Sequence, residues 1–205
     1  MADRGVFIAI EGLDGSGGTT QVSRLASLVE ARGREVIRTR EPTSGPVGKL
    51  IRRALAPDTA EAVLGDRVLP YLFAGDRRDH LDRLVLPALA RGAVVITDRY
   101  VPSSLAYQGL AIGVAEALAL NASFPAPDLT LVLEVPPEEC MRRILARGAP
   151  MERFEDTQRL ERVRTAYATG LDLLEQRGDH IIRVDGTLGI DALSERVWRH
   201  AAPLI

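Results

Sequence analysis

The fold is decided by residues 6–20, which read VFIAIEGLDGSGGTT from Val6 to Thr20. The apolar, partly β-branched run over residues 6–11 predicts a buried strand, and the apolar spacing over residues 18–32 predicts an amphipathic helix. Glycines join the two. A glycine-rich turn from strand to helix aims successive backbone N–H groups and the helix N-terminus at one point, which is an arrangement that binds phosphate.

The turn departs from the P-loop pattern at one position. That pattern is glycine, four residues, glycine, lysine, then serine or threonine. Gly12 and Gly17 have this spacing and Thr19 stands where a hydroxyl would hold magnesium, but Gly18 occupies the lysine position. The backbone cradle remains, while the mobile charge that would follow the transferred phosphoryl group is gone. By itself, the turn is compatible with an ordinary tight turn and with a nucleotide site.

The remaining chain repeats the alternation of strand and helix. Further short apolar runs predict strands, and longer amphipathic stretches predict helices. The strands are expected at residues 35–40, 93–97, 129–134 and 180–185, and the helices at 47–54, 60–91, 102–123, 137–147, 156–177 and 190–202. This pattern predicts an α/β fold, a three-layer doubly wound structure around a parallel five-stranded sheet. No long linker interrupts it, so we expect one domain over residues 1–205, with a short lid at about 147–155.

The composition excludes several classes of protein. The 205 residues carry 26 basic and 28 acidic side chains, and since Lys49 is the single lysine, 25 of the basic residues are arginines. The balanced charge argues against a protein that coats nucleic acid, and the N-terminal apolar run is too short for a signal peptide or a membrane span. One cysteine, Cys140, allows no internal disulfide. We therefore expect a cytoplasmic protein with small-molecule substrates and no nucleic-acid or membrane partner.

Charged residues stand where the predicted strands end. Asp98 lies at the carboxyl edge of the sheet, where it can organise magnesium and its waters or simply cap the next helix. Arg99 beside it offers a planar fork to a phosphate. Asp14 would repel ATP unless it faces another ligand group, and the alternative is a role in stabilising the turn. Arg40 and Glu41 precede Pro42, which sets an extended or cis turn that would direct Arg40 to a phosphate.

Two further groups of residues have ordinary structural roles as their alternatives. Phe73 and Arg77 are four residues apart on one helix face, so a ring and a guanidinium can grip a flat base; the alternative for Phe73 is a place in the core. The histidines lack partners at metal-ligand spacing, so we expect surface or satisfied core roles for them and no structural metal. These are His80, His180 and His200.

Seven segments, in order, resemble the bacterial thymidylate kinases, which transfer the γ-phosphoryl group of ATP to dTMP. They are EGLDGSG at 11–17, TREP at 39–42, LFAGDR at 72–77, DRY at 98–100, SSLAYQG at 103–109, PDLT at 127–130 and ERFE at 152–155. The resemblance covers almost the whole chain. It departs at Gly18 and after Pro42, where many relatives continue Gly-Gly-Thr and this chain has Thr43-Ser44-Gly45.

The resemblance implies roles on the acceptor side. Arg99 contacts the phosphate of dTMP, and Asp14 binds near its 3′-hydroxyl and helps to position that phosphate. Phe73 stacks on thymine, Arg77 donates to an exocyclic oxygen, and Ser104 presents a hydroxyl to the base. Further acceptor contacts are implied for Arg40, Glu41, Tyr107 and Gln108, of which Tyr107 lies against the deoxyribose carbon and Gln108 has a surface position as its alternative.

The resemblance also implies roles on the ATP side. The phosphates lie in the loop, with magnesium at Thr19 and Asp98 and with Arg143 near the adenine. The loop contributes Gly12, Leu13, Asp14, Gly15, Ser16, Gly17, Gly18, Thr19 and Thr20. Relatives that lack an arginine in this loop carry basic residues in the lid, so we expect Arg153, with Arg147, to supply the charge during transfer. Family members form homodimers, which the resemblance extends to this chain.

Three functions follow. The first is ATP:dTMP phosphotransfer. The second is a nucleotide-binding homologue impaired in catalysis that acts as a sensor or partner subunit, which Gly18 favours. The third is a kinase for another deoxynucleoside monophosphate. The residues that match the family's acceptor site favour the first function over the second.

Overall fold

The computed structural model describes residues 4–56, 64–146 and 157–205. Five strands form one parallel sheet in the order β2-β3-β1-β4-β5. They are β1 (Val6–Gly12), β2 (Val36–Arg40), β3 (Val94–Asp98), β4 (Leu129–Glu134) and β5 (Ile181–Asp185). The predicted β4 coincides with the observed strand and the other four agree within one residue at each end. The predicted five-stranded parallel sheet is confirmed.

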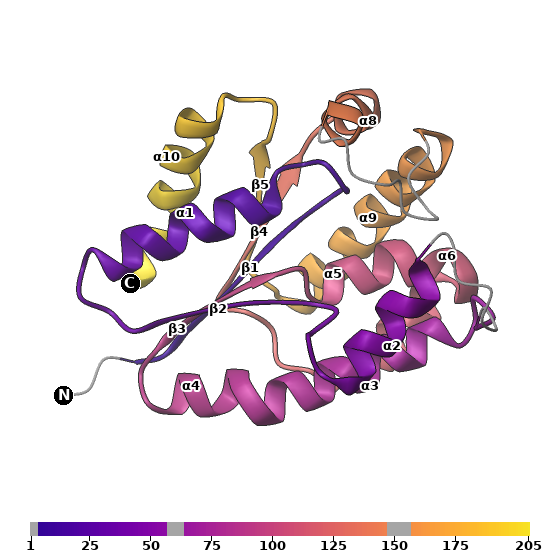
Figure 1. Cartoon of the computed structure of the whole chain (residues 1–205), viewed down its shortest axis with the longest axis horizontal. Coiled ribbons are helices and arrows are strands. Elements are labelled where there is room, and N and C mark those ends of the chain that lie inside the picture. The colour runs from indigo at the N-terminus through magenta and orange to yellow at the C-terminus, as the bar shows by residue number, and fades with distance from the viewer. Residues whose placement is uncertain (1–3, 57–63, 147–156) are drawn as a thin grey trace.

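Helices cover both faces of the sheet, so the predicted three layers are confirmed (Figure 1). On one face, α1 (Gly18–Glu30) and α10 (Ile190–Ala201) pack through Leu25, Val29 and Val197 onto β1 and β4. The other face is covered by further helices, among them α3 (Leu69–His80), α4 (Leu86–Ala90) and α9 (Thr157–Arg177). Burial on both faces explains why β1 is apolar at almost every position.

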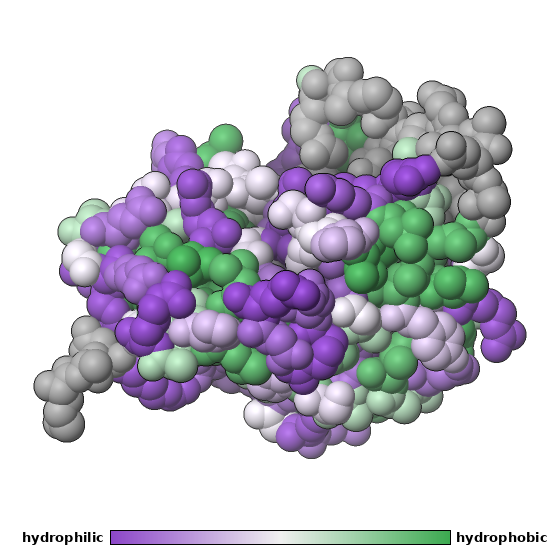
Figure 2. All heavy atoms as spheres, turned by 60° about the horizontal axis from the view of Figure 1, so that its bottom comes forward, coloured by the Kyte–Doolittle hydropathy of each residue, from purple (hydrophilic) through white to green (hydrophobic). Residues whose placement is uncertain are grey.

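Three smaller groups of elements complete the chain. They are α2 (Pro46–Leu55); the series α5 (Val101–Ser103), η2 (Ser104–Gln108), α6 (Gly109–Ile112) and α7 (Val114–Asn121); and α8 (Pro137–Ala146), with a final turn η3 (Ala202–Leu204). Some apolar side chains remain exposed on and near these elements. Leu50 of α2 and Val68 just before α3 are each 43% exposed. Figure 2 shows apolar side chains gathered on the face that is turned toward the viewer.

Two predicted helices differ from those observed. The helix predicted over 60–91 begins only at Leu69, where Pro70 suits a first turn, and it changes to a π-helical turn, η1 (Leu81–Val85). Pro87 explains this change, because proline has no N–H for the carbonyl four residues earlier and clashes with it. The helix predicted over 102–123 is broken at Gly113, whose φ of 88° is left-handed.

None of the helices in the described ranges combines the length and the apolar character that crossing a bilayer requires.

Candidate functional site

The glycine-rich loop leads from β1 into α1 as predicted. Gly17 caps α1 without a side-chain hydrogen bond, so the N–H groups of the first turn are not taken by a capping side chain. Gly15 has a φ of +85°, and a Cβ there would lie 2.5 Å from the carbonyl oxygen of Cys140. The loop therefore packs directly on α8. Any larger residue at position 15 would push the two apart.

Thr19 and Asp98 meet beside this loop. The Thr19 hydroxyl donates to Asp98 Oδ2 at 2.5 Å, and Asp98 is the last residue of β3. Hydroxyl and carboxylate oxygens suit Mg²⁺, which keeps several waters and usually takes only one or two protein ligands beside the phosphates. This donor set fits the ion. Within the described ranges, no cluster of three or more His, Cys, Asp or Glu side chains could hold a metal by itself.

Gly18 faces the same carboxylate. A Cβ added at Gly18 would lie 3.1 Å from Asp98 Oδ1, which is a tight contact. The missing lysine is thus replaced by close packing of the helix start against the end of β3.

Arg143 of α8 reaches the loop from the other side. Its Nη1 donates to the carbonyl oxygen of Ser16 at 3.3 Å and its Nη2 to that of Gly186 at 3.1 Å. Glu139 holds its Nε at 2.7 Å. Hydrogen bonds from Arg142 and then Arg143 lower the pKa of Glu139 to about 2. Arg143 is therefore fixed next to the phosphate loop.

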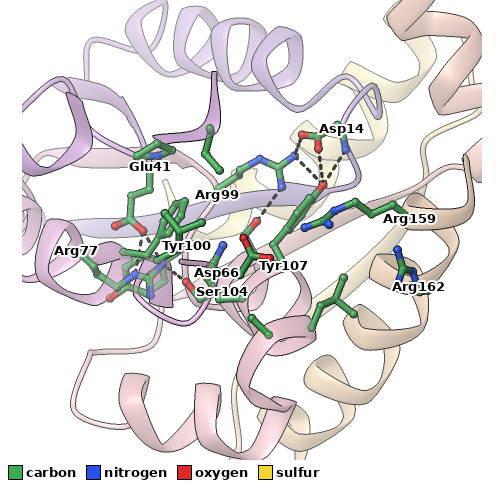
Figure 3. Close-up of a pocket in the computed structure, with 18 residues that line it drawn as sticks. Asp14, Glu41, Asp66, Arg77, Arg99, Tyr100, Ser104, Tyr107, Arg159 and Arg162 are labelled. Carbon is green, nitrogen blue, oxygen red and sulfur yellow. Dashed lines mark hydrogen bonds and ion pairs between the residues drawn. The ribbon is translucent and has the colours of Figure 1, made fainter. Parts of the chain in front are cut away.

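A cavity of about 290 Å³ opens beside the loop (Figure 3). Most of the predicted acceptor residues line it, namely Asp14, Glu41, Phe73, Arg77, Arg99, Ser104, Tyr107 and Gln108. Arg40 does not. It is exposed and lines a separate hollow with Thr19 and Asp98. The Glu41–Pro42 peptide is cis, which was one of the two predicted forms.

Arg99 lies where the cavity meets the loop. Its φ of 75° is left-handed, which is unusual for any residue other than glycine. Nη2 donates to Asp14 Oδ1 at 2.7 Å, and Nη1 donates to the Gly12 carbonyl oxygen and to Ser103 Oγ, each at 2.9 Å. Tyr107 donates to the other Asp14 oxygen at 3.0 Å. Asp14 therefore pairs with the two acceptor-side residues and does not merely stabilise its own turn.

A buried cluster supports Arg99 from behind. Glu11 is 1% exposed and accepts hydrogen bonds from Tyr100 N at 2.6 Å, Ser103 Oγ at 2.6 Å and Tyr167 Oη at 2.8 Å. Burial raises the pKa of Glu11, and Arg99 opposes that shift. Ser103 and Tyr167 touch both the carboxylate and Arg99. They therefore connect the buried charge to the guanidinium.

Arg77 is 1% exposed and makes hydrogen bonds to three side chains. Its Nε and Nη2 donate to Glu41 Oε2 at 2.9 and 2.7 Å, and Nη2 also donates to Ser104 Oγ at 3.0 Å. Nη1 donates to Asn121. Phe73 lies one turn earlier on α3 and is half-buried on the cavity wall, so its alternative as a core residue is not what is observed.

Several residues of this site were not predicted. Glu11 and Ser103 stand inside the quoted motifs but look like ordinary strand and helix residues. Tyr167, Asn121, Arg159 and Arg162 lie far along the chain, and no spacing rule joins them to the site. Arg159 and Arg162 line the cavity from α9 (Figure 3). The only signal for these two was the run of arginines at the start of α9, namely Arg159, Arg162 and Arg164.

The segment after Pro42, where the chain departs from the family pattern, is held by two partners. Asp76 accepts from Thr43 N at 2.7 Å and from Thr43 Oγ1 at 2.6 Å. Arg52 donates to the carbonyl oxygens of Pro42 and Thr43. The predicted lid at 147–155, with Arg147 and Arg153, lies outside the described residues.

Comparison with known proteins agrees with this geometry. The family described as "Thymidylate kinase" matches residues 10–197. The chain is 42% identical over 207 residues to the "Thymidylate kinase" of Xanthomonas oryzae pv. oryzae (strain PXO99A), covering 97% of this chain and 89% of that protein. It is 44% identical over 179 residues to the "Thymidylate kinase" of Xanthomonas campestris pv. campestris (strain B100), covering 87% and 75% of the two proteins. It is 44% identical over 165 residues to the "Probable thymidylate kinase" of Pyrococcus horikoshii, covering 78% of each. The resemblance inferred from the seven segments is confirmed, and the chain belongs to the thymidylate kinase family.

Proposed function

We propose that the chain transfers the γ-phosphoryl group of ATP to the phosphate of dTMP, giving dTDP and ADP. The observation that carries this proposal is the place of Arg99. Its guanidinium lies between the phosphate loop, through the Gly12 carbonyl oxygen, and the cavity that contains Phe73 and Arg77. A phosphate bound at Arg99 would therefore lie between the cavity for the base and the loop for the ATP phosphates. Transfer between two nucleotides requires this arrangement.

Arg77 selects the base by hydrogen bonding. A guanidinium has five N–H donors and no acceptor. Four of the five are used within the described residues, by Glu41 twice and by Ser104 and Asn121 once each, so one N–H of Nη1 is left for a ligand. This donor needs an acceptor oxygen such as the 4-carbonyl of thymine, whereas cytosine presents an amino group there. Ser104 keeps its own hydroxyl hydrogen for the base edge, and Phe73 stacks on the ring.

Asp14, Tyr107 and Arg99 position the sugar and phosphate. Tyr107 and Asp14 hold each other, so the tyrosine ring stays against the deoxyribose and crowds a 2′-hydroxyl. Arg99 neutralises the acceptor phosphate. Gln108 and Glu41 complete the cavity wall, and Arg40 adds positive charge on the magnesium side.

On the donor side, the loop from Gly12 to Thr20 binds the ATP phosphates through backbone N–H groups. Thr19 and Asp98 would hold Mg²⁺, which neutralises charge on the β- and γ-phosphates. Arg143 lies over the adenine and the loop. An acceptor phosphate oxygen forms a bond to the γ-phosphorus as the bond from that phosphorus to the β,γ-bridging oxygen breaks. No base is needed because the attacking oxygen is already ionised.

The lid arginines replace the charge of the absent lysine in this proposal. Arg153, with Arg147, reaches the γ-phosphate when the lid closes, so charge and exclusion of water arrive together. What supports this is the absence of any lysine or arginine between Gly12 and Gly18.

One experiment separates the three functions. The purified protein is incubated with Mg-ATP and each deoxynucleoside monophosphate in turn, and acceptor-dependent ADP formation is followed. Turnover with dTMP supports the proposal. Binding of dTMP without turnover indicates the impaired homologue, and faster turnover with another monophosphate indicates the third function. The donor count at Arg77 favours dTMP over dCMP.

We also propose that the protein is a single-domain, cytoplasmic homodimer. Exposed apolar side chains support the dimer, because apolar patches on a protein surface are typical of interfaces. They lie on α2, which follows β2, and just before α3, which carries Phe73 and Arg77. Sedimentation analysis would test the assembly.

A further inference from the structure

A line of buried polar side chains connects β2 to Arg77. Thr39 Oγ1 lies 2.7 Å from His80 Nε2, and His80 Nδ1 lies 3.0 Å from Glu41 Oε1. Glu41 Oε2 accepts both bonds from Arg77. The side chains of His80, Glu41 and Arg77 are 2%, 2% and 1% exposed. His80 does not line the cavity; it borders the separate hollow of Arg40, Thr19 and Asp98, where its side chain is only 2% exposed, so it reaches a ligand in the cavity only through Glu41.

The hydrogen bonds of His80 use both ring nitrogens. Nδ1 pairs with the Glu41 carboxylate, which accepts, and Nε2 pairs with the Thr39 hydroxyl, which can donate or accept. Glu41 and Arg77 form a buried ion pair of opposite charges. His80 is thus a satisfied core histidine, as predicted, but both of its nitrogens are used to orient a charged pair.

Glu41 is clamped between two residues of one helix. Arg77 and His80 are three residues apart on α3, and each takes a different oxygen of the Glu41 carboxylate. If His80 no longer held Oε1, the carboxylate could rotate about its last bond. Arg77 would then lose the two-point contact that aims its remaining N–H at the base.

We propose that His80 is a positioning residue for the base: it fixes Glu41, and Glu41 fixes the direction of the Arg77 guanidinium. This inference rests on the proposed function, because it assigns Arg77 to the base of dTMP. It predicts that His80 matters for the affinity of the acceptor nucleotide and not for ATP.

The test compares His80→Leu with His80→Asn by steady-state kinetics. Leucine fills the space but makes no hydrogen bond, whereas the side-chain amide of asparagine can donate to Glu41 from near the Nδ1 position. We expect His80→Leu to raise KM for dTMP about tenfold or more, with kcat within threefold and KM for ATP within twofold of wild type. His80→Asn should return KM for dTMP to within about threefold. His200→Asn, on α10, is the matched control for a histidine outside the site.

Each outcome decides the matter. An unchanged KM for dTMP in His80→Leu, an equal rise in both KM values, or an Asn variant no better than Leu would overturn the inference. If His80→Leu does not fold, Thr39→Val replaces it, because this variant removes only the hydroxyl that is hydrogen-bonded to His80 Nε2. Thr39→Val should raise KM for dTMP about threefold. An unchanged KM would overturn the inference. Wild type assayed in parallel separates the two failures: no turnover with dTMP would refute the proposed function and this inference with it, whereas turnover with an unchanged His80 variant refutes the inference alone.

Discussion

Tyr167→Phe removes one oxygen atom from the cluster behind Arg99 and leaves the ring in place. That ring is 5% exposed and packs edge-on against Tyr107 with centroids 6.1 Å apart, so the substitution creates no large cavity. The lost hydroxyl lies 2.8 Å from Glu11 Oε2, 2.7 Å from Ser103 Oγ and 3.3 Å from Arg99 Nη1. One donor to a buried carboxylate and one acceptor for a guanidinium disappear together.

The expected size of the effect follows from these contacts. A hydrogen bond to a charged group contributes about 1.5–3 kcal/mol, so the free energy of unfolding should fall by about 2–3 kcal/mol. The Arg99 side chain makes five hydrogen bonds and would keep four. Since Arg99 is proposed to position the acceptor phosphate, and a misplacement of about 1 Å can cost about 100-fold in rate, a partial loss of its alignment should lower kcat about tenfold. Tenfold corresponds to about 1.4 kcal/mol of the activation barrier.

The assay follows ADP release at saturating dTMP and ATP, together with urea unfolding of the same samples. Tyr100→Phe is the matched control for stability, because its buried hydroxyl bonds to the Pro125 carbonyl oxygen at 3.0 Å and not to Arg99. A Tyr167→Phe variant that unfolds more easily but keeps kcat within twofold would refute the reasoning. So would an equal loss of kcat in Tyr100→Phe, since general loosening would then explain both.

Three further predictions concern the loop, the buried acid and the lid. Gly18→Lys should give no gain or a loss in kcat, because its Cβ would lie 3.1 Å from Asp98 Oδ1; Gly18→Ala controls for crowding, and a tenfold rise with lysine would mean that the site lacks only that charge. Burial raises the pKa of Glu11 above 4.5, so the folded state binds this proton more tightly than the unfolded chain. The free energy of unfolding therefore rises as the pH falls through the raised pKa. Urea unfolding at pH 7.5 and 5.5 should therefore show wild type gaining stability relative to Glu11→Gln at the lower pH, and a difference that does not change with pH would contradict this. Arg153→Ala should lower kcat by about 100-fold or more if this arginine supplies the charge during transfer; a kcat within a few fold of wild type would exclude that role.

The strands and the loop were predictable because their signals are local. Each strand is a short apolar run buried on both faces, and the turn at Gly12–Gly17 is written in consecutive glycines. Asp98 was predictable for the same reason, since it ends such a run. The break at Gly113 and the π-helical turn before Pro87 were missed, although both residues stand in the sequence, because amphipathic spacing continues through them.

Most of the residues that line the cavity stand in the quoted motifs, but their hydrogen-bond partners were not predicted. Arg77 and Ser104 were both predicted to contact the base, and the structure shows that Arg77 donates to Ser104, to Glu41 and to Asn121. Hydrogen bonds between segments 27 to 44 residues apart leave no periodic trace in the sequence. Arg40 was expected on the acceptor side; it does not line the cavity and lies in the hollow with Thr19 and Asp98.

The sequence by itself determined the alternation of strand and helix, the phosphate loop with glycine at the lysine position, and the family. The first two are properties of neighbouring residues, determined by local sterics and hydrophobic spacing, and the family follows from the seven motif segments. Only the tertiary structure decided how the charges are held: Glu11 and Tyr167 behind Arg99, and His80 and Glu41 behind Arg77. The physical reason is that a buried charge needs partners on every side, and the packed helices and sheet bring those partners from distant parts of the chain.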